Sequence, residues 1–449
     1  MRGPCQAATA HMVVVAGCVR MTGLLQKSFS AQWLAGCNRS DTCARDNRRS
    51  VTFQWSSMPV CSSLSLQSAV ARGNNPLAPR YRRRLAGAGL LALALAACGA
   101  QNAPQEGSQA PADGVDAGAA AEPVAVREVF ATPMTPEDNI DSVASWTGPD
   151  GEVLVLATAK STHRLVAYDG FTGEFVRHIG GQGAGAGRFD RPNGIAVAGD
   201  LAFVVERDNR RVQVLELPGM ETVATFGDDV LELPYGLWVN ATGSGYEVYV
   251  TDAWMAGEDE EGEDILPPLA ELDRRVHRFA FNPQDGSARH VGAFGDTSPE
   301  GALRVVESLW GDPENNRLLV AEEDETYSNE FKVYDLEGNF TGDIVGAGDL
   351  EAQAEGIMLK ACGNGDGWWI TTAQGSDRST FHLFDRRDLE HVGAVTGATV
   401  ANTDGIWLHD EPSPRFPQGV LYAVHDDQGM VAIDWREIAV ALELPECPR

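Results

Sequence analysis

A short phrase recurs along the chain and limits what the chain can fold into. It places a polar residue before a small residue, usually glycine, and then hydrophobic residues. Gly194 and Gly236 are 42 residues apart, Gly356 and Gly405 are 49 apart, and a longer gap separates the third and fourth copies. The copies are Asp141-Ser-Val-Ala-Ser-Trp146, which is degenerate, Pro192-Asn-Gly-Ile-Ala-Val197, Pro234-Tyr-Gly-Leu-Trp-Val239, Glu307-Ser-Leu-Trp-Gly311, Glu355-Gly-Ile-Met-Leu359 and Asp404-Gly-Ile-Trp-Leu408.

Short apolar runs accompany these phrases, for example Leu201-Ala-Phe-Val-Val205 and Arg317-Leu-Leu-Val-Ala-Glu322. Such runs between Gly, Asp, Asn and Pro are typical of β-strands joined by turns. About 320 residues in six repeats leave roughly 54 for each, which is enough for four strands. A radial stack of such sheets buries both faces of every sheet without a free edge. The sequence therefore predicts an all-β fold, a six-bladed β-propeller.

The N-terminal part is predicted not to belong to this fold. Arg82-Arg-Arg84 precedes the apolar run 85–97 and then Cys98, which is the order of a lipoprotein signal peptide with Cys98 as the lipidated residue. A transmembrane helix needs about 20 apolar residues, and this run is too short. Residues 1–97 are thus interpreted as an extended gene start followed by a signal peptide. Gly99 follows the cysteine, as in Gram-negative lipoproteins that are exported onward, so we expect a lipid-anchored protein of the outer membrane, facing the periplasm or the exterior.

Two further segments follow the signal peptide. Residues 98–125 are rich in Ala, Gly and Pro and poor in aromatic residues, so they are predicted to be a disordered tether. Residues 126–449 are predicted to form the folded domain. With Cys98 lipidated, Cys362 and Cys447 remain as an even pair in an oxidising compartment. That pattern predicts a disulfide between them, with a metal site made of the two cysteines as the weaker alternative.

The charge of the exported part limits its partners. The first 97 residues hold 12 of the 35 Lys and Arg and 2 of the 64 Asp and Glu, so the remainder carries a formal charge of −39. Nucleic acids and anionic membranes require clustered Lys and Arg, so we expect no nucleic-acid partner and membrane contact only through the lipid anchor. The acidic surplus indicates either bound cations or a solvated surface. Carboxylates recur at one place in several repeats, as Glu307, Glu322-Glu323-Asp324, Glu355 and Asp404, which indicates a central face that binds hard cations.

Several phrases in the second half fall in the order and spacing of one enzyme family. They are Ala321-Glu-Glu-Asp324, Glu355-Gly-Ile357, Thr371-Thr-Ala-Gln-Gly-Ser376, Phe381-His-Leu-Phe-Asp385, Asn402-Thr-Asp-Gly-Ile406 and Phe416-Pro-Gln-Gly-Val-Leu421. In these phrases the chain resembles the β-propeller phytases, calcium-dependent enzymes that hydrolyse myo-inositol hexakisphosphate (phytate). The first half is similar to the generic NHL propeller repeat in Gly185-Ala-Gly-Arg-Phe-Asp-Arg-Pro-Asn-Gly-Ile-Ala-Val197, which implies only a binding scaffold.

The resemblance implies a set of site residues. The Ca²⁺ ligands would be Asp141, Glu307, Glu322, Glu355, Asp404 and Asp426. Lys160, Arg207 and Tyr235 would bind the phosphorylated substrate, and Glu307, Glu355 and Arg207 would form the catalytic group. Two positions depart from the family pattern: Asp252-Ala253 replaces a lysine of the third repeat, and Gln353 replaces an acid. Arg274 or Arg275 could supply the missing cation.

The implied chemistry agrees with an acidic protein. Carboxylates repel phosphate, so Ca²⁺ must lie between protein and substrate, where it neutralises charge and makes a bridging water more acidic. Residues 98–449 contain no Cys-x5-Arg loop, Gly-x-Ser-x-Gly elbow or paired-His zinc pattern that would indicate another hydrolase chemistry. We therefore expect a monomeric, 3-phytase-like phosphoric monoester hydrolase acting on phytate or a related phosphate ester. The alternatives are a non-catalytic, NHL-like calcium-binding scaffold and a calcium-dependent lactonase.

Overall fold

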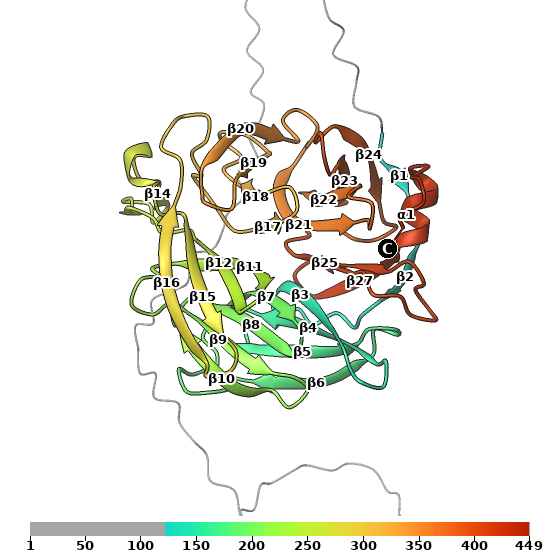
Figure 1. Ribbon diagram of the computed structural model, residues 1–449, viewed down its shortest axis with the longest axis horizontal. Coiled ribbons are helices and arrows are strands. Elements are labelled where there is room, and N and C mark those ends of the chain that lie inside the picture. The colour runs from blue at the N-terminus through green and yellow to red at the C-terminus, as the bar shows by residue number, and fades with distance from the viewer. Residues whose placement is uncertain (1–121, 449) are drawn as a thin grey trace, which may run out of the picture. The chain divides into compact units, whose positions relative to one another are not determined.

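Six β-sheets surround a common axis in the computed structural model, which describes residues 122–448 (Figure 1). The predicted six-bladed β-propeller is confirmed. The predicted signal peptide, the lipidated Cys98 and most of the tether lie outside the described residues. No helix among residues 122–448 is long and apolar enough to cross a membrane.

The first three blades follow one another along the chain, each running from an innermost to an outermost strand. Blade 1 comprises β3 (Ile140–Thr147), β4 (Val153–Ala159), β5 (Arg164–Asp169) and β6 (Phe175–Gly180); blade 2 comprises β7 (Pro192–Ala198), β8 (Leu201–Glu206), β9 (Arg211–Glu216) and β10 (Glu221–Phe226). Blade 3 comprises β11 (Pro234–Thr242), β12 (Gly245–Asp252), β15 (Val276–Asn282) and β16 (Ser287–Phe294). Its long insertion holds the short pair β13 (Gly257–Glu258) and β14 (Asp264–Ile265) and the 3₁₀ turn η1 (Leu269–Glu271).

The last three blades close the ring. Blade 4 comprises β17 (Leu309–Asp312), β18 (Arg317–Glu322), β19 (Glu330–Tyr334) and β20 (Phe340–Val345); blade 5 comprises β21 (Gln353–Ala361), β22 (Gly367–Gln374), β23 (Thr380–Asp385) and β24 (His391–Thr396). Blade 6 comprises β25 (Ile406–His409), β26 (Val420–His425), β27 (Gly429–Asp434) and, outermost, β2 (Glu128–Ala131). The helix α1 (Trp435–Ala441) follows β27.

The N-terminal residues complete the propeller from the outside. Strand β2 pairs antiparallel with β27, so one blade contains both the beginning and the end of the described chain. Strand β1 (Val124–Ala125) adds in parallel to β24 of blade 5. The predicted tether, 98–125, therefore overlaps the fold by these two residues. Cys362, after β21, and Cys447, after α1, form a disulfide.

Burial follows from the position of a strand in its blade. Strand β4 is buried at every residue but one, because its two faces lie against neighbouring blades. Strand β16, at the edge of blade 3, alternates between exposed and partly buried residues, which is the period of two expected for an outer strand. Continuous apolar runs thus mark inner strands, and alternating ones mark the rim.

The small residue of the recurring phrase lies where innermost strands of adjacent blades meet. A Cβ at Gly236 would lie 2.1 Å from the carbonyl oxygen of Glu307, and a Cβ at Gly405 would lie 2.8 Å from the carbonyl oxygen of Asp141. The amide of Gly405 donates to that same Asp141 oxygen at 3.0 Å. Glycine is needed here because another backbone approaches closely. The glycine recurs because blades 2, 3, 5 and 6 each have this contact with the next blade.

Replacing Gly236 by alanine should lower the free energy of unfolding by about 1–3 kcal/mol, the usual cost of overpacking. The added Cβ would displace the backbone of Glu307. Gly243→Ala is the matched control, because a Cβ there would meet nothing within 4 Å, and we expect it to change stability little. Urea unfolding measures both variants, and equal stabilities would contradict this account of the repeat.

Candidate functional site

Each blade presents one side chain from the start of its innermost strand. This residue precedes the small residue of the recurring phrase, and in blades 1, 2, 3 and 5 the register between the first two strands shifts at this point. Such a bulge re-aims a side chain. The six residues are Asp141, Asn193, Tyr235, Glu307, Glu355 and Asp404, and we call them the inner ring.

A second position lies at the end of the second strand of each blade. In blade 2 it is Arg207, the residue that follows Glu206, which pairs with Pro192 of the first strand. The equivalent residues, read from the strand registers, are Lys160, Arg207, Ala253, Glu323, Gln374 and Asp426. We call them the outer ring. Its cations come from blades 1 and 2, whereas the carboxylates come from blades 4 and 6.

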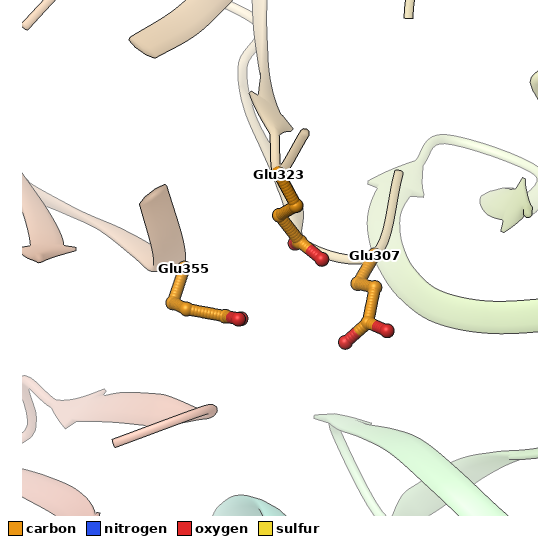
Figure 2. A group of neighbouring side chains, drawn as sticks. All are labelled: Glu307, Glu323 and Glu355. Atoms are coloured by element: carbon orange, nitrogen blue, oxygen red, sulfur yellow. The ribbon is translucent and has the colours of Figure 1, made fainter. Parts of the chain in front are cut away.

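Three glutamates of the two rings converge on one point. Carboxylate oxygens of Glu307, Glu323 and Glu355 lie within 4.8 Å of one another, and Figure 2 shows their side chains directed into a common space from separate segments. Glu323 and Glu355 are buried, and Glu307 is partly buried. Oε2 of Glu323 is buried without a hydrogen-bond partner. Buried carboxylates this close repel one another, so they fit a cation that prefers several oxygen ligands.

Without a cation, this group holds protons that ordinary carboxylates release. Burial raises the pKa of Glu307 to about 8, and the neighbouring Asp141 adds to the shift. Burial and the charge of Glu355 raise the pKa of Glu323 well above its usual value. The pKa of Glu355 is also raised, by burial and by Glu307. The metal-free site thus lowers its negative charge by protonation.

Lys160 lies among the remaining acids of the inner ring. Its Nζ is 2.6 Å from Oδ1 of Asp141 and 3.6 Å from Oδ2 of Asp404, and it donates to the hydroxyl of Tyr235 at 3.3 Å. That hydroxyl donates to Oδ1 of Asp141 at 3.2 Å. Gln374 donates to the other oxygen of Asp404. Burial would lower the pKa of Lys160, but Asp141, Tyr235, Asp404 and Glu307 outweigh it and hold that pKa well above its usual value.

Glu322, which the resemblance named as a ligand, faces away from this cluster. Its carboxylate accepts the backbone N–H groups of Arg304 at 2.8 Å, Val305 at 3.2 Å and Asp324 at 3.1 Å. These bonds hold the segment that leads into Glu307. The carboxylate that reaches the cluster belongs to the next residue, Glu323.

The residues equivalent to Glu322 in blades 2 and 3 also bind backbone amides. Glu206 of blade 2 accepts the amide of Asp190 at 3.1 Å, and Asp252 of blade 3 accepts the amides of Glu232 and Leu233 at 2.8 and 2.7 Å. Each carboxylate holds the loop before the first strand of its own blade. Asp252, although it lies where the sequence departs from the family pattern, therefore still holds the loop before its blade.

Asp426 and Arg207 occupy the outer ring but have local partners. Asp426 is exposed and accepts Gln428 at 3.0 Å, whereas the next residue, Asp427, is close enough to Lys160 and Asp141 for their charges to act on its pKa, which burial raises. Nε of Arg207 lies 2.7 Å from Oδ1 of the neighbouring Asp208. Asp426, like Glu322, thus lies one residue before a carboxylate that belongs to the cluster.

Two residues of blade 2 join the site although the sequence did not single them out. Asn193 takes the inner-ring position of that blade, and both polar atoms of its buried amide lack a hydrogen-bond partner. Arg191 has a positive φ of 50° before a proline, its Nε is buried without a partner, and its charge opposes the rise in the pKa of Glu307. The available signal was the alignment of Asn193 with the acids of the other phrases.

Neither arginine suggested as a replacement for the missing cation is available for that role. Arg275 is fully buried and donates to four backbone carbonyls, those of Leu303, Asp252, Trp254 and Arg304. Arg274 pairs with Glu232 and lies over the ring of Trp254 at 4.2 Å. Blade 3 therefore contributes Tyr235 and the neutral Ala253 to the two rings.

Comparison with known protein families gives a match in the second half of the chain. The model of the family described as Phytase matches residues 303–431, which include Glu307, Glu323, Glu355 and Asp404. This match, together with the six-bladed fold, confirms the resemblance to the β-propeller phytases and supports a hydrolase. A search of curated proteins finds no significant match.

Three solved structures illustrate the wider similarity. Hydrazine synthase of Kuenenia stuttgartiensis is 11% identical with a TM-score of 0.37, over 70% of this chain and 86% of that chain. A member of the DUF4221 family from Bacteroides vulgatus is 9% identical with a TM-score of 0.42, over 68% and 95%. A chain of the nidogen/laminin complex is 12% identical with a TM-score of 0.39, over 62% of this chain and 88% of that chain. At these TM-scores none bears on the function of this chain.

The stability of the metal-free protein should fall as the pH rises from about 7.5 to 9. In this range the unfolded glutamates are ionised, whereas folded Glu307 loses its proton near pH 8, so the folded state binds more protons and becomes less stable as they leave. Burial lowers the pKa of His277 and His382 to about 4, and in the unfolded chain they lose their protons near pH 6.5, so they raise stability with pH only below this range. Urea unfolding in chelator measures the trend, and Glu307→Gln should flatten it. A flat or rising wild-type profile would contradict the assignment.

Proposed function

We propose that this chain, which matches the phytase family over residues 303–431 on a six-bladed β-propeller, is a calcium-dependent phosphomonoester hydrolase that acts on phytate or a related phosphate ester. The observation that carries the proposal is the convergence of Glu307, Glu323 and Glu355 within 4.8 Å. A cation-binding group of this kind lies beside Lys160 and Tyr235, which suit a phosphate.

Calcium fits the donors better than other common ions. All candidate ligand atoms are carboxylate oxygens from several blades, and Ca²⁺ accepts six to eight such oxygens in flexible geometry. Typical Zn²⁺ sites include at least one Cys or His ligand beside any carboxylates, and the three described residues of this cluster are all glutamates. Bound Ca²⁺ supplies charge neutralisation for the phosphate and a more acidic water. The proposed ligands are Glu307, Glu323 and Glu355, with Asp141, Asp404 and Asp427 beside them.

The distribution of charge supports an oriented phosphate. Blades 1 and 2 supply Lys160, Arg191 and Arg207, whereas blades 4, 5 and 6 supply all of the carboxylates except Asp141 of blade 1, which pairs with Lys160. A phosphate held by metal on the acidic side would meet cationic groups on the other side. Arg207 can form two parallel bonds to phosphate oxygens once it leaves Asp208, which a lysine cannot do.

The location is part of the same proposal. The disulfide between Cys362 and Cys447 supports a protein that folds in an oxidising compartment. Anchoring through a lipid on Cys98 would give a monomer tethered to the outer membrane, where it would meet phosphorylated small molecules. Residue 98 lies outside the described residues.

A calcium-binding scaffold without catalysis is the second candidate. The specific observation in its favour is the neutral outer-ring position of blade 3, Ala253, with Arg274 and Arg275 engaged elsewhere. A scaffold would bind Ca²⁺ at the same glutamates but would not release phosphate. The two functions are therefore separated by a single assay.

The purified protein should release phosphate from phytate in millimolar Ca²⁺ and lose this activity in chelator. Glu355→Gln should lower Ca²⁺ affinity by at least about 10- to 100-fold, since even groups behind the ligands have effects of that size, and activity should fall with it. The matched control is Glu390→Gln, an exposed acid of the same blade. Ca²⁺ binding without phosphate release would favour the scaffold.

Arg207→Ala should raise the Michaelis constant for phytate by about tenfold or more, the effect of losing a charge-assisted hydrogen bond of about 1.5–3 kcal/mol. The maximal rate should change less, and Ca²⁺ affinity should remain. Arg210→Ala removes an exposed arginine from the same turn and serves as the control. Equal Michaelis constants in the two variants would remove Arg207 from the substrate site.

A further inference from the structure

Lys160 is held among inner-ring residues beside the three glutamates. Its side chain comes from the end of β4 and is only 7% exposed. An ammonium group has three N–H donors and no acceptor, and Asp141, Tyr235 and Asp404 lie at 2.6, 3.3 and 3.6 Å from its nitrogen. Its donors are thus directed at the cluster, and in this arrangement Lys160 is not available to a phosphate.

The sequence makes this lysine distinctive. Residues 122–448 contain three lysines, Lys160, Lys332 and Lys360. Lys332 is fully buried and pairs with Glu330, and Lys360 is buried and pairs with Asp410. Lys160 is therefore the one lysine of this part of the chain that lies among carboxylates proposed to bind metal.

We propose that Lys160 is the built-in counter-ion of the metal-free site, and that Ca²⁺ displaces its ammonium group from Asp141 and Asp404 and releases it toward the phosphate of the substrate. This inference rests on the proposed function. If Ca²⁺ at the three glutamates also takes Asp141 and Asp404 as ligands, it competes with the ammonium group for these two carboxylates. If Ca²⁺ and the ammonium group both lay within the cluster, two positive charges would be a few ångströms apart. Their repulsion is strong in a buried site of low dielectric constant.

The exchange would set the order of binding. Before metal binds, the cluster holds Lys160 and presents carboxylates that repel phosphate. Binding of Ca²⁺ adds positive charge to the site and also frees the ammonium group of Lys160. Phosphate would then bind only to the metal-loaded protein. The hydroxyl of Tyr235 contacts both Lys160 and Asp141. It could keep its hydrogen bond to Asp141 after Lys160 has left.

Calorimetric titration of Ca²⁺ into Lys160→Met tests the competition. Methionine keeps the apolar stem and removes the charge, so Ca²⁺ should bind more tightly than in the wild type, on the order of tenfold, which corresponds to about 1.4 kcal/mol. The metal-free variant should unfold at a lower temperature than the wild type, and Ca²⁺ should raise its midpoint by more. Arg210→Met removes an exposed charge from the neighbouring blade and controls for net charge. Unchanged or weaker Ca²⁺ binding by Lys160→Met would overturn the proposal.

Amine acetylation of the wild-type protein, read by mass spectrometry, tests the movement without a variant. Ca²⁺ should increase acetylation of Lys160 several-fold relative to chelator. Lys332 and Lys360 are buried internal controls and should stay unmodified in both conditions. Equal or lower acetylation of Lys160 in Ca²⁺ would overturn the release of the side chain.

The outcomes separate this inference from the proposed reaction. Tighter Ca²⁺ binding by Lys160→Met in a protein that releases no phosphate from phytate would overturn the reaction and support the exchange. Calcium-dependent phosphate release by the wild type, with Ca²⁺ binding unaffected by Lys160→Met, would overturn the exchange alone. A wild type that binds no Ca²⁺ would overturn both.

Discussion

The close approach of backbones at the axis is the constraint on which this site depends. Innermost strands of adjacent blades meet at the small residue of each recurring phrase, and a Cβ at Gly194 would lie 2.7 Å from the carbonyl oxygen of Tyr235. With the main chains so close, the preceding side chains are brought together at one end of the axis. Four of the six are carboxylates. The fold thus concentrates negative charge at its centre, and raised pKa values, the buried Lys160 and the proposed Ca²⁺ are three ways of compensating it.

The fold and the inner ring could be predicted because both depend on one sequence pattern. Small residues and turn residues recur at the blade period, and the residue before each small residue lies at the axis. Glu307, Glu355 and Asp404 were therefore assigned to the centre by their place in the phrase. The same rule would have placed Asn193 there, but an asparagine does not stand out among acids when only charge is sought.

The outer ring was harder to predict because it depends on strand register. Side chains alternate along a strand, so a shift of one residue exchanges the two faces. In Glu322-Glu323 both residues are acids, and only the structure shows that the first binds backbone amides while Oε2 of the second is buried beside the cluster without a hydrogen-bond partner. Asp426 and Asp427 pose the same ambiguity. The engagement of Arg275 with four carbonyls depends on two blades and a loop, which no local pattern encodes.

Ring closure in blade 6 also has a consequence for the order in which a newly made chain becomes competent. Among residues 122–448, strand β2 is the second strand to be synthesised, yet its partner β27 is the last. The amide of Ile140, beside Asp141, donates to the carbonyl of Asp427 at 2.6 Å, so acids from the two ends of the chain acquire fixed positions together. A nascent or truncated chain can form separate blades but cannot present the complete cluster. The proposed metal site would therefore be completed only when β27 has joined β2 in blade 6.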